Sequence, residues 1–177
     1  MSLNAVSSQV VTQVYSRLSD PVGGFNPGIV ANAANYNLPT NFIVVDWSTS
    51  SANFVFGQVD PLLVEKSGII TYPWAALYIR ESANTNIQKF NQFSGQVRCV
   101  FDVYLSWIPI KGLQNFDAYP NCVEDVVLDV INRVENQDWA MPVVYNGQIQ
   151  SKRGPVIYGA NNWKQQIGFS MIFEVHQ

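Results

Sequence analysis

Two long segments in the second half of the chain alternate between apolar residues and residues that are mostly polar or small. Apolar side chains stand at every second position from Val97 to Trp107, and again from Ile167 to Val175. A period of two places all of these side chains on one face of a β-strand. The two segments therefore predict a pair of strands that bury one face in a core and keep the other face outside it.

Two amphipathic segments predict helices. From Leu3 to Leu18, apolar residues recur at spacings of three and four. From Asn121 to Asn136 a stripe of valines and one isoleucine follows the same spacing, and Asn121 with Glu124 has the pattern of a capping box. Because β-branched valines lower helix propensity, we expect packing on a sheet to hold this second helix.

The remaining segments predict further short elements. We expect strands at 42–47, 53–58, 72–81, 96–108, 143–150, 156–158 and 163–176, a short helical piece at 60–66 and irregular structure at 25–40. The strands 72–81 and 96–108 predict a hairpin, which the long polar connection 82–95 joins. Residues 151–155 read as a basic turn.

This order of elements predicts an α+β fold, a mostly antiparallel sheet with a long hairpin, flanked by two amphipathic helices. Residues 1–177 show no shift in composition and suffice for one core, so we expect a single domain. The first eight residues lack the pattern of a secretory leader, and no apolar run approaches the ~20 residues of a membrane span. We therefore expect neither a leader nor contact with a membrane.

Charged residues make up only 13% of the chain, where about 25% is typical. The net charge of −3 argues against a free-standing nucleic-acid binder, whose affinity depends on Lys and Arg. A neutral polar and aromatic surface is cheaper to desolvate than a charged one, which favours burial against other protein chains. An extracellular β-rich domain can share this composition.

The sequence predicts no catalytic site, no metal site and no cofactor. Its one histidine, His176, is next to last, and Cys99 and Cys122 lack the paired spacing of a zinc site. We expect both cysteines to be buried free thiols. Two alternatives stay open: a carbohydrate- or cell-surface-binding β-rich module in which Trp139 or Trp163 stacks on sugars, and an enzyme of unrecognised type.

The order of elements resembles that of bacteriophage tail-terminator and tail-completion (head–tail joining) proteins, which are small α+β subunits that form rings at the head-proximal end of a tail. The resembling segments are the N-terminal helix at 3–18, the strand pair at 74–81 and 96–107, the helix at 122–134, and the closing strand that begins at Trp163.

The resemblance implies a structural virion protein rather than an enzyme, assembled in the host cytoplasm. Its subunits would form a homo-oligomeric ring, such as a hexamer, that contacts the tail tube protein and the head-connector proteins, with DNA passing through it and no sequence read. Another phage neck or minor virion protein is the alternative. The residues expected at subunit or partner contacts are Asn84, Asn86, Gln88, Lys89, Phe90, Lys152 and Arg153, although long polar loops equally serve as solvent-exposed connections.

Overall fold

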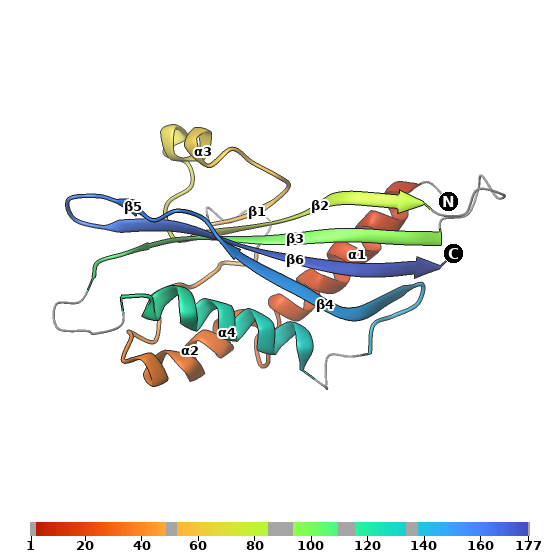
Figure 1. Cartoon of the computed structure of the whole chain (residues 1–177), viewed down its shortest axis with the longest axis horizontal. Helices are drawn as coiled ribbons and strands as arrows, with labels where there is room; N and C mark the ends of the chain where they lie inside the picture. The colour runs from red at the N-terminus through yellow and green to blue at the C-terminus, as the bar shows by residue number, and fades with distance from the viewer. Residues whose placement is uncertain (1–2, 49–52, 85–93, 110–115, 134–137, 177) are drawn as a thin grey trace.

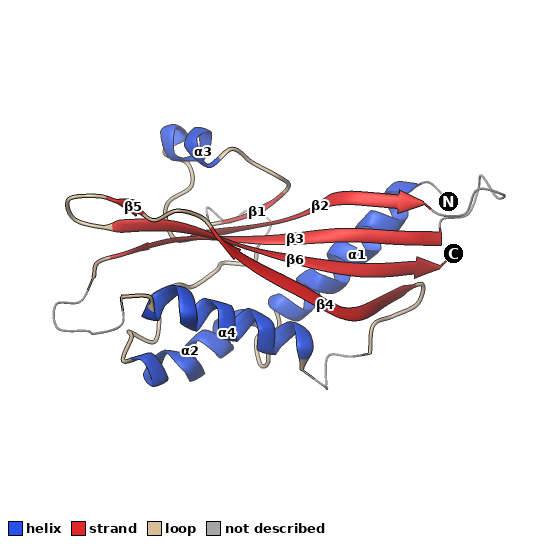
Figure 2. Cartoon of the chain, viewed as in Figure 1, coloured by secondary structure: helices blue, strands red, loops and turns tan. Residues whose placement is uncertain are grey.

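A computed structural model describes residues 3–48, 53–84, 94–109, 116–133 and 138–176 (Figure 1). Over these residues the chain has an α+β fold, as the sequence predicts: a six-stranded, mostly antiparallel sheet with four α-helices. Three of the helices cover one face of the sheet, and the fourth lies over the other face at one end (Figure 2). The sheet does not close into a barrel.

The strand order is β1-β2-β3-β6-β4, and β5 lies beside β6. The strands are β1 (Phe54–Phe56), β2 (Trp74–Asn84), β3 (Ser94–Trp107), β4 (Val143–Arg153), β5 (Ile157–Tyr158) and β6 (Trp163–His176). Among the strands of the described residues, only β1 and β2 pair in parallel. The predicted β2–β3 hairpin is confirmed, and its ladder reaches Asn84↔Gly95, so the strands extend further into 82–95 than the sequence indicated.

The two alternating segments are the central strands β3 and β6. They pair without interruption from Ser94↔His176 to Trp107↔Trp163. Their odd-numbered side chains merge into one apolar face, and this face is buried from Val97 to Trp107 and from Ile167 to Val175. The period of two therefore identified both the strands and the core that they share.

Three helices cover this face: α1 (Leu3–Leu18), α2 (Phe25–Ala33) and α4 (Ala118–Asn132). The prediction of irregular structure at 25–40 is wrong, because α2 and a 3-10 turn, η1 (Ala34–Tyr36), occupy most of it. Pro27 and Gly28 suggested a break, but proline is tolerated in the first helical turn. A Cβ on Gly28 would lie 2.7 Å from Val126 Cγ1, so the glycine allows α2 to approach α4 closely.

The strand predicted at 42–47 is also wrong, because this extended segment pairs with no other strand. Asparagine side chains take the place of a ladder. Asn26 donates to Val45 O at 2.8 Å and accepts from Val45 N at 3.0 Å, and Asn53 accepts from Asp46 N at 2.7 Å. The segment thus carries Ile43 and Val45 into the core, and side chains pair with the backbone groups of Val45 and with the N–H of Asp46.

The short helix α3 (Pro61–Ser67) confirms the helical piece expected at 60–66. Asp60 caps it by accepting from Leu62 N at 2.9 Å. Val64 packs there with Trp74 and Tyr104, whose rings stack at 3.7 Å between centroids. This helix covers only one end of the second sheet face and leaves the rest of that face open (Figure 1).

Cys99 and Cys122 are buried free thiols, as predicted. Burial raises the pKa of both thiols. In the described part of the chain, no helix has both the length and the apolar character needed to cross a lipid bilayer.

Candidate functional site

Three of the seven predicted contact residues belong to the described part of the chain, and all three are strand residues. Asn86, Gln88, Lys89 and Phe90 lie outside the described residues. Asn84 ends β2, is exposed, and accepts a hydrogen bond from Ser94 N at 3.3 Å. Lys152 and Arg153 end β4, so the predicted basic turn at 151–155 is wrong over these residues. As neighbours on a strand, they point to opposite faces of the sheet.

Arg153 points to the helix layer. Its Nε donates to Glu124 Oε1 at 3.0 Å, and its Nη2 donates to Glu124 Oε2 and Asn121 Oδ1, each at 2.5 Å. The hydrogen bond to Glu124 raises the pKa of the guanidinium. Arg153 therefore joins β4 to α4 within one subunit.

The capping box predicted for Asn121 and Glu124 is wrong. Helix α4 begins at Ala118, earlier than predicted, so Asn121 already lies inside its first turns. Asp117 stands at the N-cap without a capping hydrogen bond from its side chain. The pair Asn121 and Glu124 binds Arg153 across the layer instead of the helix's own backbone.

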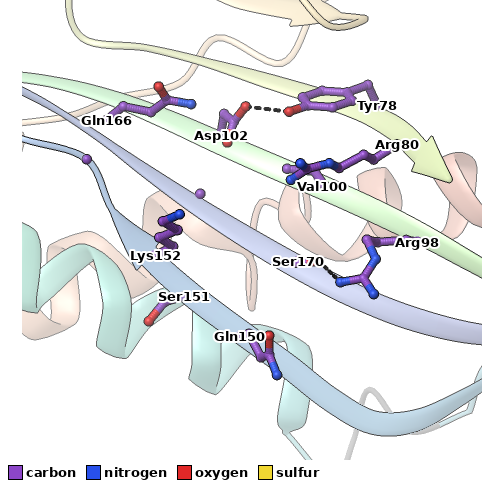
Figure 3. Close-up of a pocket in the computed structure, with 12 residues that line it drawn as sticks. Tyr78, Arg80, Arg98, Val100, Asp102, Gln150, Ser151, Lys152, Gln166 and Ser170 are labelled. Carbon is purple, nitrogen blue, oxygen red and sulfur yellow. Dashed lines mark hydrogen bonds between the residues drawn. The ribbon is translucent and has the colours of Figure 1, made fainter.

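Lys152 points to the open face, where a hollow of about 520 Å³ crosses β2, β3, β6 and β4 (Figure 3). Its lining combines cationic, amide and hydroxyl side chains with one valine and two glycines. The lining residues are Tyr78, Arg80, Arg98, Val100, Asp102, Gln150, Ser151, Lys152, Gly154, Gln166, Gly168 and Ser170. This hollow is the candidate site for a ligand on the sheet face.

Asp102 forms part of the floor of the hollow and is only 4% exposed. Its Oδ2 accepts a hydrogen bond from the Tyr78 hydroxyl at 2.9 Å. Burial raises the pKa of the Asp102 carboxyl, against the opposing hydrogen bonds from Tyr78 and Gln166. Burial and the neighbouring carboxylate raise the pKa of Tyr78 as well. A Cβ on Gly168, the residue opposite on β6, would lie 2.8 Å from Asp102 Oδ1, so a larger residue there would displace the carboxyl.

Three cationic side chains surround this floor. Arg98 donates to Ser170 Oγ at 3.2 Å, and its Nε lies 3.5 Å from Glu81 Oε2. A β-bulge between Ile79 and Glu81 shifts the register of β2 at Arg80, and Arg80 reaches the hollow (Figure 3). Lys152 is exposed and forms no ion pair with any described residue. The hollow is therefore positively charged around a buried carboxyl.

Two unlike strand edges remain free among the described residues. Strand β1 covers β2 only as far as Leu77, so β2 beyond it pairs with β3 alone. Strand β4 pairs with β6 alone. Such edges present unpaired N–H and C=O groups, which can pair with another chain.

Both tryptophans that were left open as sugar platforms are half-buried and contact other rings of the same subunit. Trp139 packs against Phe173 at 4.8 Å between centroids, with the Arg17 guanidinium 3.5 Å from its ring centre. Trp163 contacts Trp107 and Tyr158 in edge-on geometry. These contacts assign both rings to packing.

Sequence reasoning did not identify the hollow. A signal existed in the intervening positions of the two alternating segments, where Asp102 is opposite Gly168 and Arg98 donates to Ser170. Arg80 follows Trp74, Ala76 and Tyr78 at every second position and so lies on the same face, whereas the bulge brings Glu81 opposite Arg98 and left no mark in the alternation. Comparison with models of known protein families and with the sequences of curated proteins gives no match for this chain.

Proposed function

We propose that the chain is a structural virion subunit of the tail-terminator type, which forms a ring at the head-proximal end of a phage tail and joins the tail tube to the head connector. The observation that carries the proposal is the open sheet with two unlike free edges, β2 beyond Leu77 and β4. The order of elements that resembles tail-terminator proteins supports it.

The unlike edges favour a head-to-tail contact over a two-fold one. If β2 of one subunit pairs with β4 of the next, every subunit uses the same two surfaces, and a constant rotation closes a ring. Added strands gain backbone hydrogen bonds that need few charged side chains. Asn84 and Lys152, two of the predicted contact residues, lie on these two strands.

Exposed apolar side chains at one end of the subunit suit contact with a second kind of protein. Strand β5 and helix α3 lie at this end (Figure 1), with Ile157, Tyr158, Leu62 and Leu63 each more than 60% exposed. Large apolar residues gathered on a surface mark interaction sites. In the proposed ring, this end is the surface that meets the tail tube or the connector.

Native mass measurement of the purified chain tests the ring. We expect one closed oligomer of defined order, and co-purification of the protein with virions. A strictly monomeric protein at high concentration, absent from purified particles, would contradict the proposal.

Cysteine cross-linking tests which edges meet. We expect Ala83→Cys on β2, mixed with a chain that carries Asn146→Cys, Gln148→Cys or Gln150→Cys on β4, to give covalent dimers at one of the three registers, because Ala83 and Gln150 lie on the same open face of the sheet. All four positions are exposed, and the native cysteines are buried. As a matched control, Ser16→Cys on the exposed side of α1 replaces the β4 cysteine and should give none. Cross-links formed only between identical positions would indicate a two-fold contact and contradict the head-to-tail ring.

A further inference from the structure

The hollow on the open face concentrates positive charge in a chain whose net charge is −3. Three of the chain's ten Lys and Arg residues line it, namely Arg80, Arg98 and Lys152. They come from three different strands, β2, β3 and β4. Among the acidic residues that the structure describes, Asp102 alone belongs to the lining. The hollow therefore has the opposite sign to the molecule as a whole.

The acidic groups nearby do little to neutralise these cations. Asp102 is 4% exposed, and the Tyr78 hydroxyl occupies one of its oxygens, so it lies beneath the surface that a ligand would touch. Glu81 pairs only with Arg98, at 3.5 Å, through a side chain that is 65% exposed. Exposed pairs of this kind are weak and screened by salt. An anion placed in the hollow thus meets a net positive field.

Neutral donors accompany the cations. The Ser170 hydroxyl and the Gln150 and Gln166 amides line the same hollow (Figure 3). Arg, Lys, Ser and Gln side chains are the groups that contact phosphate oxygens in complexes with nucleic acids. From β2 to β4 the hollow crosses three strand spacings, roughly 14 Å, which exceeds one phosphate group and suits several in succession.

We propose that this hollow binds the phosphodiester backbone of a nucleic acid without reading its sequence. The flat face of a sheet offers no backbone N–H or C=O groups for pairing, which an acidic peptide in extended form would seek at a strand edge. Phosphate oxygens need only the cations and side-chain donors that the hollow provides. This proposal concerns a single subunit. It can therefore be wrong while the ring proposal is right, and the ring proposal can be wrong while this one is right.

The three cationic side chains determine the expected affinity for a nucleic acid and its dependence on salt. With three phosphates neutralised, the logarithm of the binding constant should fall with the logarithm of the salt concentration with a slope of about −2 to −3. Affinity at physiological salt is then in the range of non-specific binding, which agrees with the expectation from net charge that the chain is no free-standing binder. Binding is therefore measured at low salt.

Fluorescence anisotropy with a short labelled single strand and a duplex of arbitrary sequence, over a series of NaCl concentrations, tests the proposal. We expect saturable binding, and we expect Lys152→Gln to reduce the magnitude of the salt slope by about 1. Lys66→Gln is the matched control, because Lys66 is an exposed lysine on α3 outside the hollow. A second pair is Gln150→Glu inside the hollow, which should weaken binding, and Gln148→Glu on the same strand outside it, which should weaken it less.

Three results would overturn the proposal. The first is an absence of binding by the wild-type chain at the lowest salt concentration. The second is an equal effect of Lys152→Gln and Lys66→Gln, which would place the contact elsewhere. The third is binding of a labelled polyglutamate peptide that Lys152→Gln abolishes while DNA binding is absent, which would assign the hollow to an acidic protein segment. All four substitutions replace exposed side chains, and circular dichroism verifies that each variant is folded.

Discussion

A single arginine illustrates how side-chain direction decides a residue's role. Lys152 and Arg153 are adjacent basic residues, and the sequence treats them alike. On strand β4 the first faces the hollow, whereas the second is held by Glu124 and Asn121 of α4. Both side chains of the Arg153–Glu124 ion pair are less than 30% exposed. This contact is therefore part of what holds the helix layer on the sheet.

We predict that Glu124→Gln destabilises the protein by about 1–2 kcal/mol, because hydrogen bonds to a charged partner in a partly buried site contribute more than exposed ones. Urea unfolding measures the change. Glu81→Gln is the matched control, since the Glu81–Arg98 pair is more exposed, and it should cost no more than about 0.5 kcal/mol. Equal losses in the two variants would contradict the structural role of the Arg153 contact.

At the scale of elements, the sequence predicted strands well wherever the alternation was long. The bounds of β6 match the prediction to the residue, and β3 differs by at most two residues at either end. At 42–47, the apolar pattern correctly indicated burial of Ile43 and Val45 but not a pairing partner. Periodicity indicates which side chains face the core, whereas the hydrogen-bond partner of a backbone N–H depends on the tertiary structure. Here the partners are the side chains of Asn26 and Asn53, which lie outside the segment in the sequence.

We predict that Asn26→Ala destabilises the protein by roughly 1–3 kcal/mol, because it leaves the N–H and C=O of Val45 without their partners. Thermal or urea unfolding measures the loss. Asn32→Ala on the same helix is the control: Asn32 bonds only to Gly28 O, one turn back, and alanine favours the helix. We expect that change to be near neutral or stabilising. A smaller effect at Asn26 than at Asn32 would refute the role of Asn26 in holding the segment.

For the molecule as a whole, the sequence predicted the fold class but not the site. The hollow depends on residues of four strands whose order, β2-β3-β6-β4, no local pattern encodes. It also depends on Gly168 opposite Asp102, and on a bulge that brings Glu81 opposite Arg98. The sequence singled out Lys152 only as a predicted subunit or partner contact in a basic turn, and the strand order places it at the hollow. The register and the order of the strands bring together the other residues that line the hollow.

Hydrogen exchange distinguishes the free edges from the core of the molecule and tests whether assembly covers them. In the monomer we expect slow exchange in β3 and β6, which have a strand on each side, and fast exchange at the outward N–H groups of β4 and of β2 beyond Leu77. In the oligomer these outward groups should slow by about tenfold or more, as an added strand pairs them. The amides of β1, already beside β2 and away from the free part of that edge, serve as an internal control and should not change. Oligomers that form while both edges exchange as in the monomer would show that subunits meet through another surface, and the edge-paired ring would then be wrong.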